Sequence, residues 1–299
     1  MPGPRRALIA AALGLGLSAG TAAPVCADIT VEYLGTHVWT GGDEDFGGFS
    51  GIEVSPDGLG YTALSDRGTV RWGSILRDGQ GRIRSLSTAG RARLQDSTGT
   101  KLRPGYLGDA EGLAIDGEGR MFVSFEGLDR IARFDDPDGP AIRIPPAPEF
   151  ESLQRNAGLE ALAVTPEGDL LTMPERWNSP EPLTPVWRFR DGAWSTAFHL
   201  PRDERWAPVG ADVGPDGRLY VLERDFRGLR GFASRVRRYA MDEAGIGPPE
   251  PILESSLMQF DNLEGIAVWQ DGQGIRITMI SDDNFLFVQR TELVEYRIR

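Results

Sequence analysis

The chain has 299 residues, a formal net charge of −12, 40% hydrophobic residues and a single cysteine. Its acidity argues against nucleic acid and anionic membranes as partners, because both repel a negatively charged surface, and one cysteine cannot form a disulfide framework. With 38 glycines and 21 prolines, the composition indicates many turns and short strands rather than long helices.

The first predicted element is a signal peptide. Two arginines precede an apolar run over residues 7–17, and a small-residue cleavage site ends at Ala27. Cleavage there leaves a mature domain of residues 28–299, without cysteine and, because the two lost charges are arginines, with a net charge of −14. The paired arginines leave Sec and twin-arginine export both open. No later stretch approaches the ~20 apolar residues that cross a bilayer, so we expect a periplasmic or secreted protein whose mature chain does not insert into a membrane.

A hairpin pattern then recurs five times. Each copy has a short apolar strand, a turn with Asp-Gly or Glu-Gly, and a second β-rich strand, which together are a strong hairpin signal. The copies cover residues 49–66, 110–126, 158–175, 209–225 and 262–283. When Glu111 is the reference, the equivalent residues are 61, 49, 49 and 55 positions apart: Ser50, Glu111, Glu160, Val209 and Glu264. Repeats of this length predict an all-β chain folded as a single β-propeller with five blades.

Two features of this architecture follow from the chain ends and from one long interval. The segment between Asp225 and Leu263 has room for a sixth, degenerate blade, so six blades are the alternative. The C-terminal segment Glu295–Arg299 is expected to pair with strands from the N-terminus and close the ring. A β-sandwich would not explain the regular spacing of the repeats.

Acidic residues lie at the end of each hairpin that is opposite the turn. If the hairpins turn on two residues, Glu111 faces Glu126 and Glu160 faces Glu175, at ~5 Å between Cβ atoms. If the first strand is the innermost of its blade, these acids gather at one mouth of the central channel. Carboxylates so close together need a bound cation, a retained proton or neighbouring arginines.

The expected cation is Ca²⁺, which takes six to eight oxygen ligands. Its candidate ligands are Asp109, Glu111, Glu126, Glu160, Glu175, Glu264 and Asp282. An arginine directly follows an acid in three repeats, and such arginines would orient an anionic substrate: Arg67, Arg176 and Arg224. The structural alternative is that each acid ties backbone groups of neighbouring blades together.

Other catalytic groups receive little support from the sequence. The two histidines, His37 and His199, are far apart in the chain, and a triad of Ser50 with His37 lacks the G-x-S-x-G spacing of a nucleophile elbow. The single lysine, Lys101, does not follow a phosphate-binding glycine loop.

Several segments resemble the phytase-like family of secreted bacterial proteins, which is described as having esterase-like activity of the phytase type. They include "GGFSGIEVSPDG", "DAEGLAID", "NAGLEALAV" and "NLEGIAVW", and the resemblance extends from about Phe46 to Phe285. It implies a β-propeller with a Ca²⁺-assisted esterase or phosphoesterase site built on acids at its mouth. The Asp-Asp-Pro-Ala and Asn-Asn-Val-Asp motifs of established propeller phytases are absent, so a smaller anionic ester or phosphoester is a better expectation than phytate.

The leading hypothesis is an exported hydrolase in which Ca²⁺, held by several of these acids, activates water. Glu111 and Glu160 are the expected catalytic acids, and Arg67, Arg176 and Arg224 the expected catalytic arginines. A lactonase-like propeller hydrolase is the alternative enzyme, and a propeller that binds a ligand or partner without turnover is the non-enzymatic one.

Overall fold

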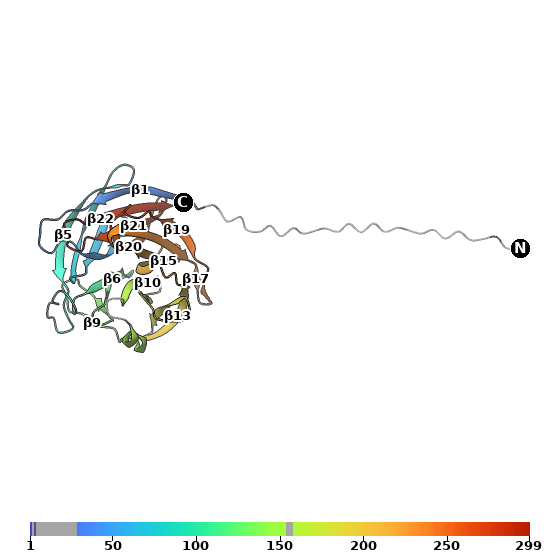
Figure 1. Cartoon of the computed structure of the whole chain (residues 1–299), viewed down its shortest axis with the longest axis horizontal. Helices are drawn as coiled ribbons and strands as arrows, with labels where there is room; N and C mark the ends of the chain where they lie inside the picture. The colour runs from blue at the N-terminus through green and yellow to red at the C-terminus, as the bar shows by residue number, and fades with distance from the viewer. Residues whose placement is uncertain (2, 4–28, 154–157) are drawn as a thin grey trace.

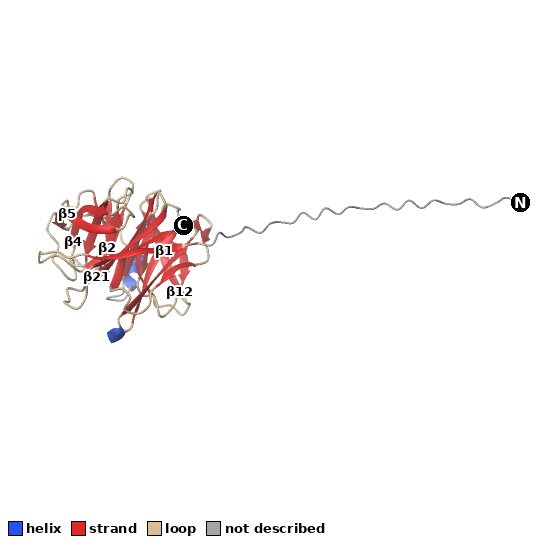
Figure 2. Ribbon diagram, turned by 90° about the horizontal axis from the view of Figure 1, so that it is seen from above, coloured by secondary structure: helices blue, strands red, loops and turns tan. Residues whose placement is uncertain are grey.

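The structure is a computed structural model that describes residues 1, 3, 29–153 and 158–299. Apart from positions 1 and 3, the predicted signal peptide lies outside the described residues. Within the described part, no helix is long and apolar enough to span a membrane. Strands make up nearly all of the regular structure, as Figure 2 shows.

Across residues 29–153 and 158–299, the strands form five four-stranded antiparallel sheets around a common centre (Figure 1). The first blade contains β2 (Phe49–Val54), β3 (Gly60–Ser65), β4 (Thr69–Arg77) and β5 (Ile83–Arg93). The second contains β6 (Ala110–Ile115), β7 (Met121–Phe125), β8 (Arg130–Phe134) and β9 (Ile142–Arg143). The third contains β10 (Leu159–Val164), β11 (Leu170–Pro174), β12 (Leu183–Arg190) and β13 (Ala193–Pro201). The fourth contains β14 (Ala207–Val213), β15 (Leu219–Phe226), β16 (Phe232–Tyr239) and β19 (Glu250–Glu254). The fifth contains β20 (Asn262–Asp271), β21 (Gly274–Asp282), β22 (Glu292–Ile298) and β1 (Val31–Val38).

The innermost strands β2, β6, β10, β14 and β20 pack against one another in this order and close back onto β2. The prediction of a five-bladed propeller is therefore confirmed. The alternative sixth blade is absent from the described residues, because the interval between Asp225 and Leu263 supplies two strands of the fourth blade and a short hairpin of β17 (Met241–Asp242) with β18 (Gly245–Ile246). Two short 3-10 turns complete the structure, at Pro148–Ser152 and Gly228–Arg230.

The expected closure of the ring is also confirmed. β1 joins the outer edge of the fifth blade by antiparallel pairing with β22, from Val31 opposite Ile298 to Val38 opposite Glu292. The N-terminal strand and the C-terminal strand thus complete one blade together, which fixes the two ends of the propeller to each other.

The apolar core lies between neighbouring blades. Phe49 and Ile52 of the first blade pack with Ile280 of the fifth, and the rings of Trp39 and Phe49 stack with centroids 5.0 Å apart. Because both faces of a blade are covered by its neighbours, the inner strands are nearly continuous buried runs, such as residues 159–163.

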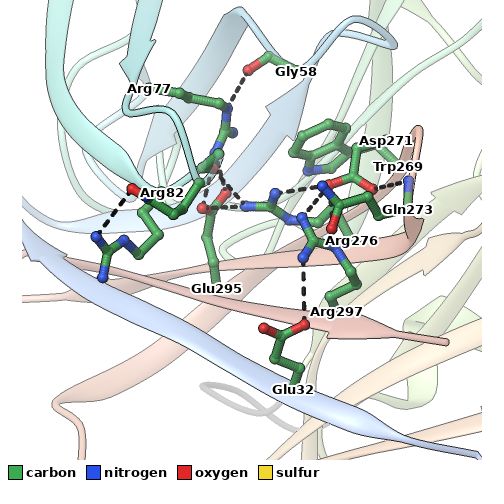
Figure 3. A network of polar contacts seen from close by, with 12 residues as sticks. Glu32, Gly58, Arg77, Arg82, Trp269, Asp271, Gln273, Arg276, Glu295 and Arg297 are labelled. Carbon is green, nitrogen blue, oxygen red and sulfur yellow. Dashed lines mark hydrogen bonds and ion pairs between the residues drawn. The ribbon is translucent and has the colours of Figure 1, made fainter.

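A buried ionic network also joins the fifth blade to the first (Figure 3). Arg276 of β21 donates to Glu295 of β22 at 2.6 Å, and Arg77 of β4 donates to the same carboxylate at 2.8 Å. Arg276 also pairs with Asp271 at 3.0 Å, which in turn receives Arg297 at 2.6 Å. Arg276 and Glu295 are 1% and 2% exposed, so this network holds together the blade that closes the ring.

Candidate functional site

Each innermost strand carries a β-bulge close to the same mouth of the channel. The pairing with the second strand shifts there, and a bulge of this kind re-aims the unpaired side chain. The bulges contain the residues that the repeat spacing made equivalent: Ser50, Glu111, Glu160, Val209 and Glu264. Of these, Glu111, Glu160 and Glu264 line one cavity. The repeat spacing therefore identified a position that all five blades share.

The expected face-to-face arrangement of the glutamates is wrong. The β6–β7 hairpin pairs Ile115 with Met121, so its turn is longer than two residues. The Glu126 N–H donates to the carbonyl of Asp109 at 3.0 Å, two residues before Glu111. The longer turn and the bulge shift the register together, and the two glutamates are staggered along the strands rather than opposite each other.

A second shared position lies at the end of each blade's second strand. Its backbone pairs with the residue of the first strand that lies two positions before the bulged residue. Backbone pairing joins Glu126 to Asp109 there, and the same relation holds in the other four blades. The five residues at this position are Asp66, Glu126, Glu175, Arg224 and Asp282. The first, second, third and fifth blades thus supply a carboxylate at this position, whereas the fourth blade supplies a guanidinium group.

The structure brings the predicted ligands to this mouth in two adjoining groups. Asp109, Glu111 and Glu126 each offer an oxygen within 4.8 Å of the other two. The remaining four line the cavity together with Glu111: Glu160, Glu175, Glu264 and Asp282. Asp66, which sequence reasoning did not include, lines the same cavity. Carboxylate oxygens without histidine or cysteine are a donor set for a hard cation such as Ca²⁺.

Burial and mutual repulsion raise the pKa values of these carboxyl groups. Desolvation is the largest cause for Glu111, whose pKa lies well above its usual range, and repulsion from Glu160 adds to it. Desolvation also raises the pKa of Glu160 well above the usual value. It raises the pKa of Asp282 to about 9 and that of Asp66 to about 6. Burial therefore favours the protonated forms of these carboxyl groups wherever no positive charge compensates them.

Glu160 is one of the mouth carboxylates that no described residue contacts by a hydrogen bond to the side chain. The residue is 8% exposed and lines both the mouth cavity and the narrow channel below it. Among the described residues, no hydrogen bond or ion pair reaches its side-chain oxygens. A buried carboxylate without such a partner is costly to keep ionised, so this group is suited to receive a ligand or a proton.

The three predicted arginines lie in different surroundings. Arg224 is buried among the acids: it pairs with Glu175 at 3.1 Å and also with Glu264. Arg176 lines the cavity with its side chain 67% exposed, 3.9 Å from Glu175. Arg67 stacks over the ring of Phe285, 3.2 Å from its centroid, and is not among the residues described as lining the cavity.

The cavity is a cleft of about 940 Å³ that lies mainly over the third, fourth and fifth blades. Besides the carboxylates named above, its lining includes Trp177, Arg205, Trp206 and Phe226. Asp109 and Glu126 border a separate cavity of about 410 Å³ with Tyr106 and Phe150. The group of three carboxylates thus lies between two cavities, and Glu111 contributes to the larger one.

The histidines lie away from this mouth. His37 is on β1 and His199 on β13, each the outermost strand of its blade. The Ser50 hydroxyl donates to the carbonyl of Ala110 at 2.6 Å, which uses its proton for a contact between two blades. The arrangement does not support a serine–histidine triad.

Comparison with known proteins places the chain in a family. Residues 44–285 match the Phytase-like family, described as "esterase-like activity of phytase". No curated protein sequence matches the chain.

Solved structures of similar arrangement have low sequence identity. The PQQ-bound aldose sugar dehydrogenase of Streptomyces coelicolor is 12% identical with a TM-score of 0.47, over 91% of this chain and 98% of that one. A catalytically inactive virginiamycin B lyase of Staphylococcus aureus with quinupristin is 14% identical with a TM-score of 0.44, over 90% and 99%. The nidogen/laminin complex is 15% identical with a TM-score of 0.43, over 78% and 74%. None of these similarities bears on the chemistry of the mouth, whereas the family match covers most of the chain: the protein belongs to the Phytase-like family.

Proposed function

We propose that this protein is a cation-assisted hydrolase of small anionic esters or phosphoesters, with Ca²⁺ as the cation. The observation that carries the proposal is the convergence of carboxylates from different blades on one mouth, where three of them lie within 4.8 Å of one another beside a cleft of about 940 Å³. Membership of the Phytase-like family supports an esterase-type activity.

The three clustered carboxylates, Asp109, Glu111 and Glu126, would hold the cation, because their oxygens converge and no ion pair reaches them from the residues that the structure describes. A bound Ca²⁺ would supply positive charge that polarises an ester or phosphoryl oxygen and lowers the pKa of a bound water. The bulges of β6 and β10 keep Glu111 and Glu160 at the channel end of their strands. Rigid inner strands therefore position both catalytic candidates.

Glu160 would transfer the proton. It lines the cleft, has no hydrogen-bonding partner among the described residues, and burial raises its pKa well above the usual range of a glutamate. A carboxyl group with such a pKa exchanges protons closer to neutral pH than an exposed glutamate does.

Arg176 is the arginine best placed to bind the anionic part of the substrate, because it lines the cleft and is 67% exposed. Arg224 would act through the acids that it contacts rather than on the substrate. Arg67, which stacks on Phe285, would act through its charge on the neighbouring Asp66, where it opposes the rise in pKa that burial causes.

We also propose export to the periplasm or the medium, from the predicted signal peptide. Cell fractionation with and without residues 1–27 tests this point, since removal of a true signal peptide retains the protein in the cytoplasm.

The activity is tested with a substrate panel of phosphomonoesters, phosphodiesters, carboxylic esters and lactones, each with Ca²⁺ or with a chelator. The informative variant is Glu111→Gln, and its matched control is Glu118→Gln, in the exposed turn of the same hairpin. Ca²⁺-dependent hydrolysis that Glu111→Gln loses and Glu118→Gln keeps would support the proposal. Turnover of lactones alone would favour the lactonase alternative, and ligand-induced stabilisation without product would favour a binding protein.

A further inference from the structure

At the second of the two positions that the blades share, the acidic pattern of the mouth has one exception. At the end of the second strand, the first, second, third and fifth blades place a carboxylate, whereas the fourth blade places Arg224. The fourth blade also has Val209, an uncharged residue, in its bulge. The same blade therefore lacks both acids and supplies the guanidinium group that pairs with two mouth carboxylates, Glu175 and Glu264. Arg176, the other described arginine beside Glu175, is exposed and lies 3.9 Å from that carboxylate.

The contacts of Arg224 are those of a cation surrounded by oxygen atoms. Its guanidinium group pairs with Glu175 of the third blade at 3.1 Å, with Glu264 of the fifth blade, and with the Asn262 side-chain oxygen at 3.0 Å. These oxygens come from two blades on either side of the fourth, and the Arg224 side chain is only 16% exposed. Asn262 in turn donates to Glu264 at 2.7 Å, which fixes the position of that carboxylate.

The carboxylates of the second blade differ from those that Arg224 contacts. Arg224 neutralises charge on the side of the mouth between the third and fifth blades, while Asp109, Glu111 and Glu126 on the second blade have no ion pair among the described residues. Glu160, more than nine-tenths buried and without a hydrogen-bonding partner there, lies between the two sides and faces the cleft. Among the described residues, the closest guanidinium contacts with the mouth carboxylates thus lie between the third and fifth blades.

We propose that the Arg224 guanidinium group is a built-in cation: it occupies a cation position formed by Glu175, Glu264 and Asn262, and so restricts a mobile cation to the carboxylates of the second blade. This inference deepens the proposed function, on which it rests for the second-blade cation. Arg224 is then a positioning residue, because it fixes the number and the place of the cations rather than touching the substrate.

The test is the number of Ca²⁺ ions bound per chain, measured by isothermal titration calorimetry and by metal analysis after dialysis. We expect one ion for the unmodified protein and two for Arg224→Met, which removes the charge but keeps a long side chain. Arg224→Lys keeps the charge and should bind one ion. Arg176→Met is the matched control, since this exposed arginine lies beside the same Glu175, and it should also bind one ion.

Thermal unfolding provides the second measurement. With a chelator, Arg224→Met should unfold at a lower temperature than the unmodified protein, because Glu175 and Glu264 lose their counter-charge. Millimolar Ca²⁺ should remove most of this difference, whereas Arg176→Met should show little difference in either condition.

The outcomes separate this inference from the proposed function. One ion in both the unmodified protein and Arg224→Met would overturn the inference and leave the hydrolase proposal intact, as would an Arg224→Met protein that does not fold even in Ca²⁺. No ion in the unmodified protein but one in Arg224→Met would support the built-in cation and contradict the Ca²⁺ site of the second blade.

Discussion

Gly112 follows the bulged Glu111 and controls how closely the second and third blades approach each other. A Cβ atom at this position would lie 2.7 Å from the Cβ of Leu162 and 2.8 Å from the backbone oxygen of Glu160. Neither atom can move by side-chain rotation alone, so Gly112→Ala must displace the inner strand of the third blade. Overpacking of this kind costs ~3 kcal/mol at the upper end of its usual range. We therefore expect a clear loss of stability.

The matched control is Gly117→Ala in the turn of the same hairpin, where an added Cβ meets no atom within 4 Å. At ~2 °C per kcal/mol for a domain of this size, Gly112→Ala should lower the unfolding midpoint by ~6 °C, while an unhindered surface change stays within ~0.5 kcal/mol. Differential scanning calorimetry of both variants measures the difference. Equal midpoints for the two variants would refute the close packing of the inner strands.

Two further predictions concern the ring closure and the pH dependence. Glu295→Gln should lower the free energy of unfolding by ~3–5 kcal/mol in urea, because Arg276 and Arg77 lose a buried partner. The control is Glu32→Gln, at the 42%-exposed end of the network, which should cost under ~1 kcal/mol. Similar losses for both variants would contradict the role of Glu295. In the chelated protein, Asp66 and Asp282 have folded-state pKa values of about 6 and about 9, above the ordinary 3.8. Raised carboxyl pKa values contribute stability that is present below the unfolded-state pKa and is lost as the pH rises through the folded-state pKa. Urea unfolding should therefore show stability falling between about pH 4 and 9, less steeply in Asp282→Asn, and a rise over this range would contradict the raised values.

The sequence was sufficient to predict the propeller, its five blades and the gathering of acids at one mouth. The reason is that each repeat has the same two strands, with Glu111 and its equivalents at regular intervals. The closure by the two chain ends was also predictable, because the C-terminal strand "EYRIR" needs a partner and β1 supplies it.

The register of the hairpins could not be predicted. A bulge adds one unpaired residue, and the resulting one-residue shift redirects every later side chain. The inner strands are nearly continuous apolar runs, so no alternation of apolar and polar residues reveals where the extra residue lies. For this reason Glu111 and Glu126 are staggered instead of opposite.

The hairpin register also decides which residue of each Glu-Arg pair faces the mouth. The Glu-Arg pairs at 175–176 and 223–224 look alike in the sequence, yet the shared ring position is taken by Glu175 in one blade and by Arg224 in the other. Glu223 is instead buried under Arg235 and Arg237. The spacing in the sequence distinguishes the two pairs: Glu175 follows Glu160 by 15 residues, and Arg224, rather than Glu223, follows Val209 by the same number.

A cation held by the carboxylates of the mouth should raise the unfolding midpoint of the chelated protein when Ca²⁺ is added, and this comparison is the most direct measurement of such a site. A ligand that binds only the folded state stabilises it by ~2.7 kcal/mol at a hundredfold excess over its dissociation constant, which corresponds to ~5 °C here. We expect a rise of this size in the unmodified protein and in Glu118→Gln, and no rise in Glu111→Gln. The absence of any rise with Ca²⁺, Mg²⁺ and Mn²⁺ would contradict such a site.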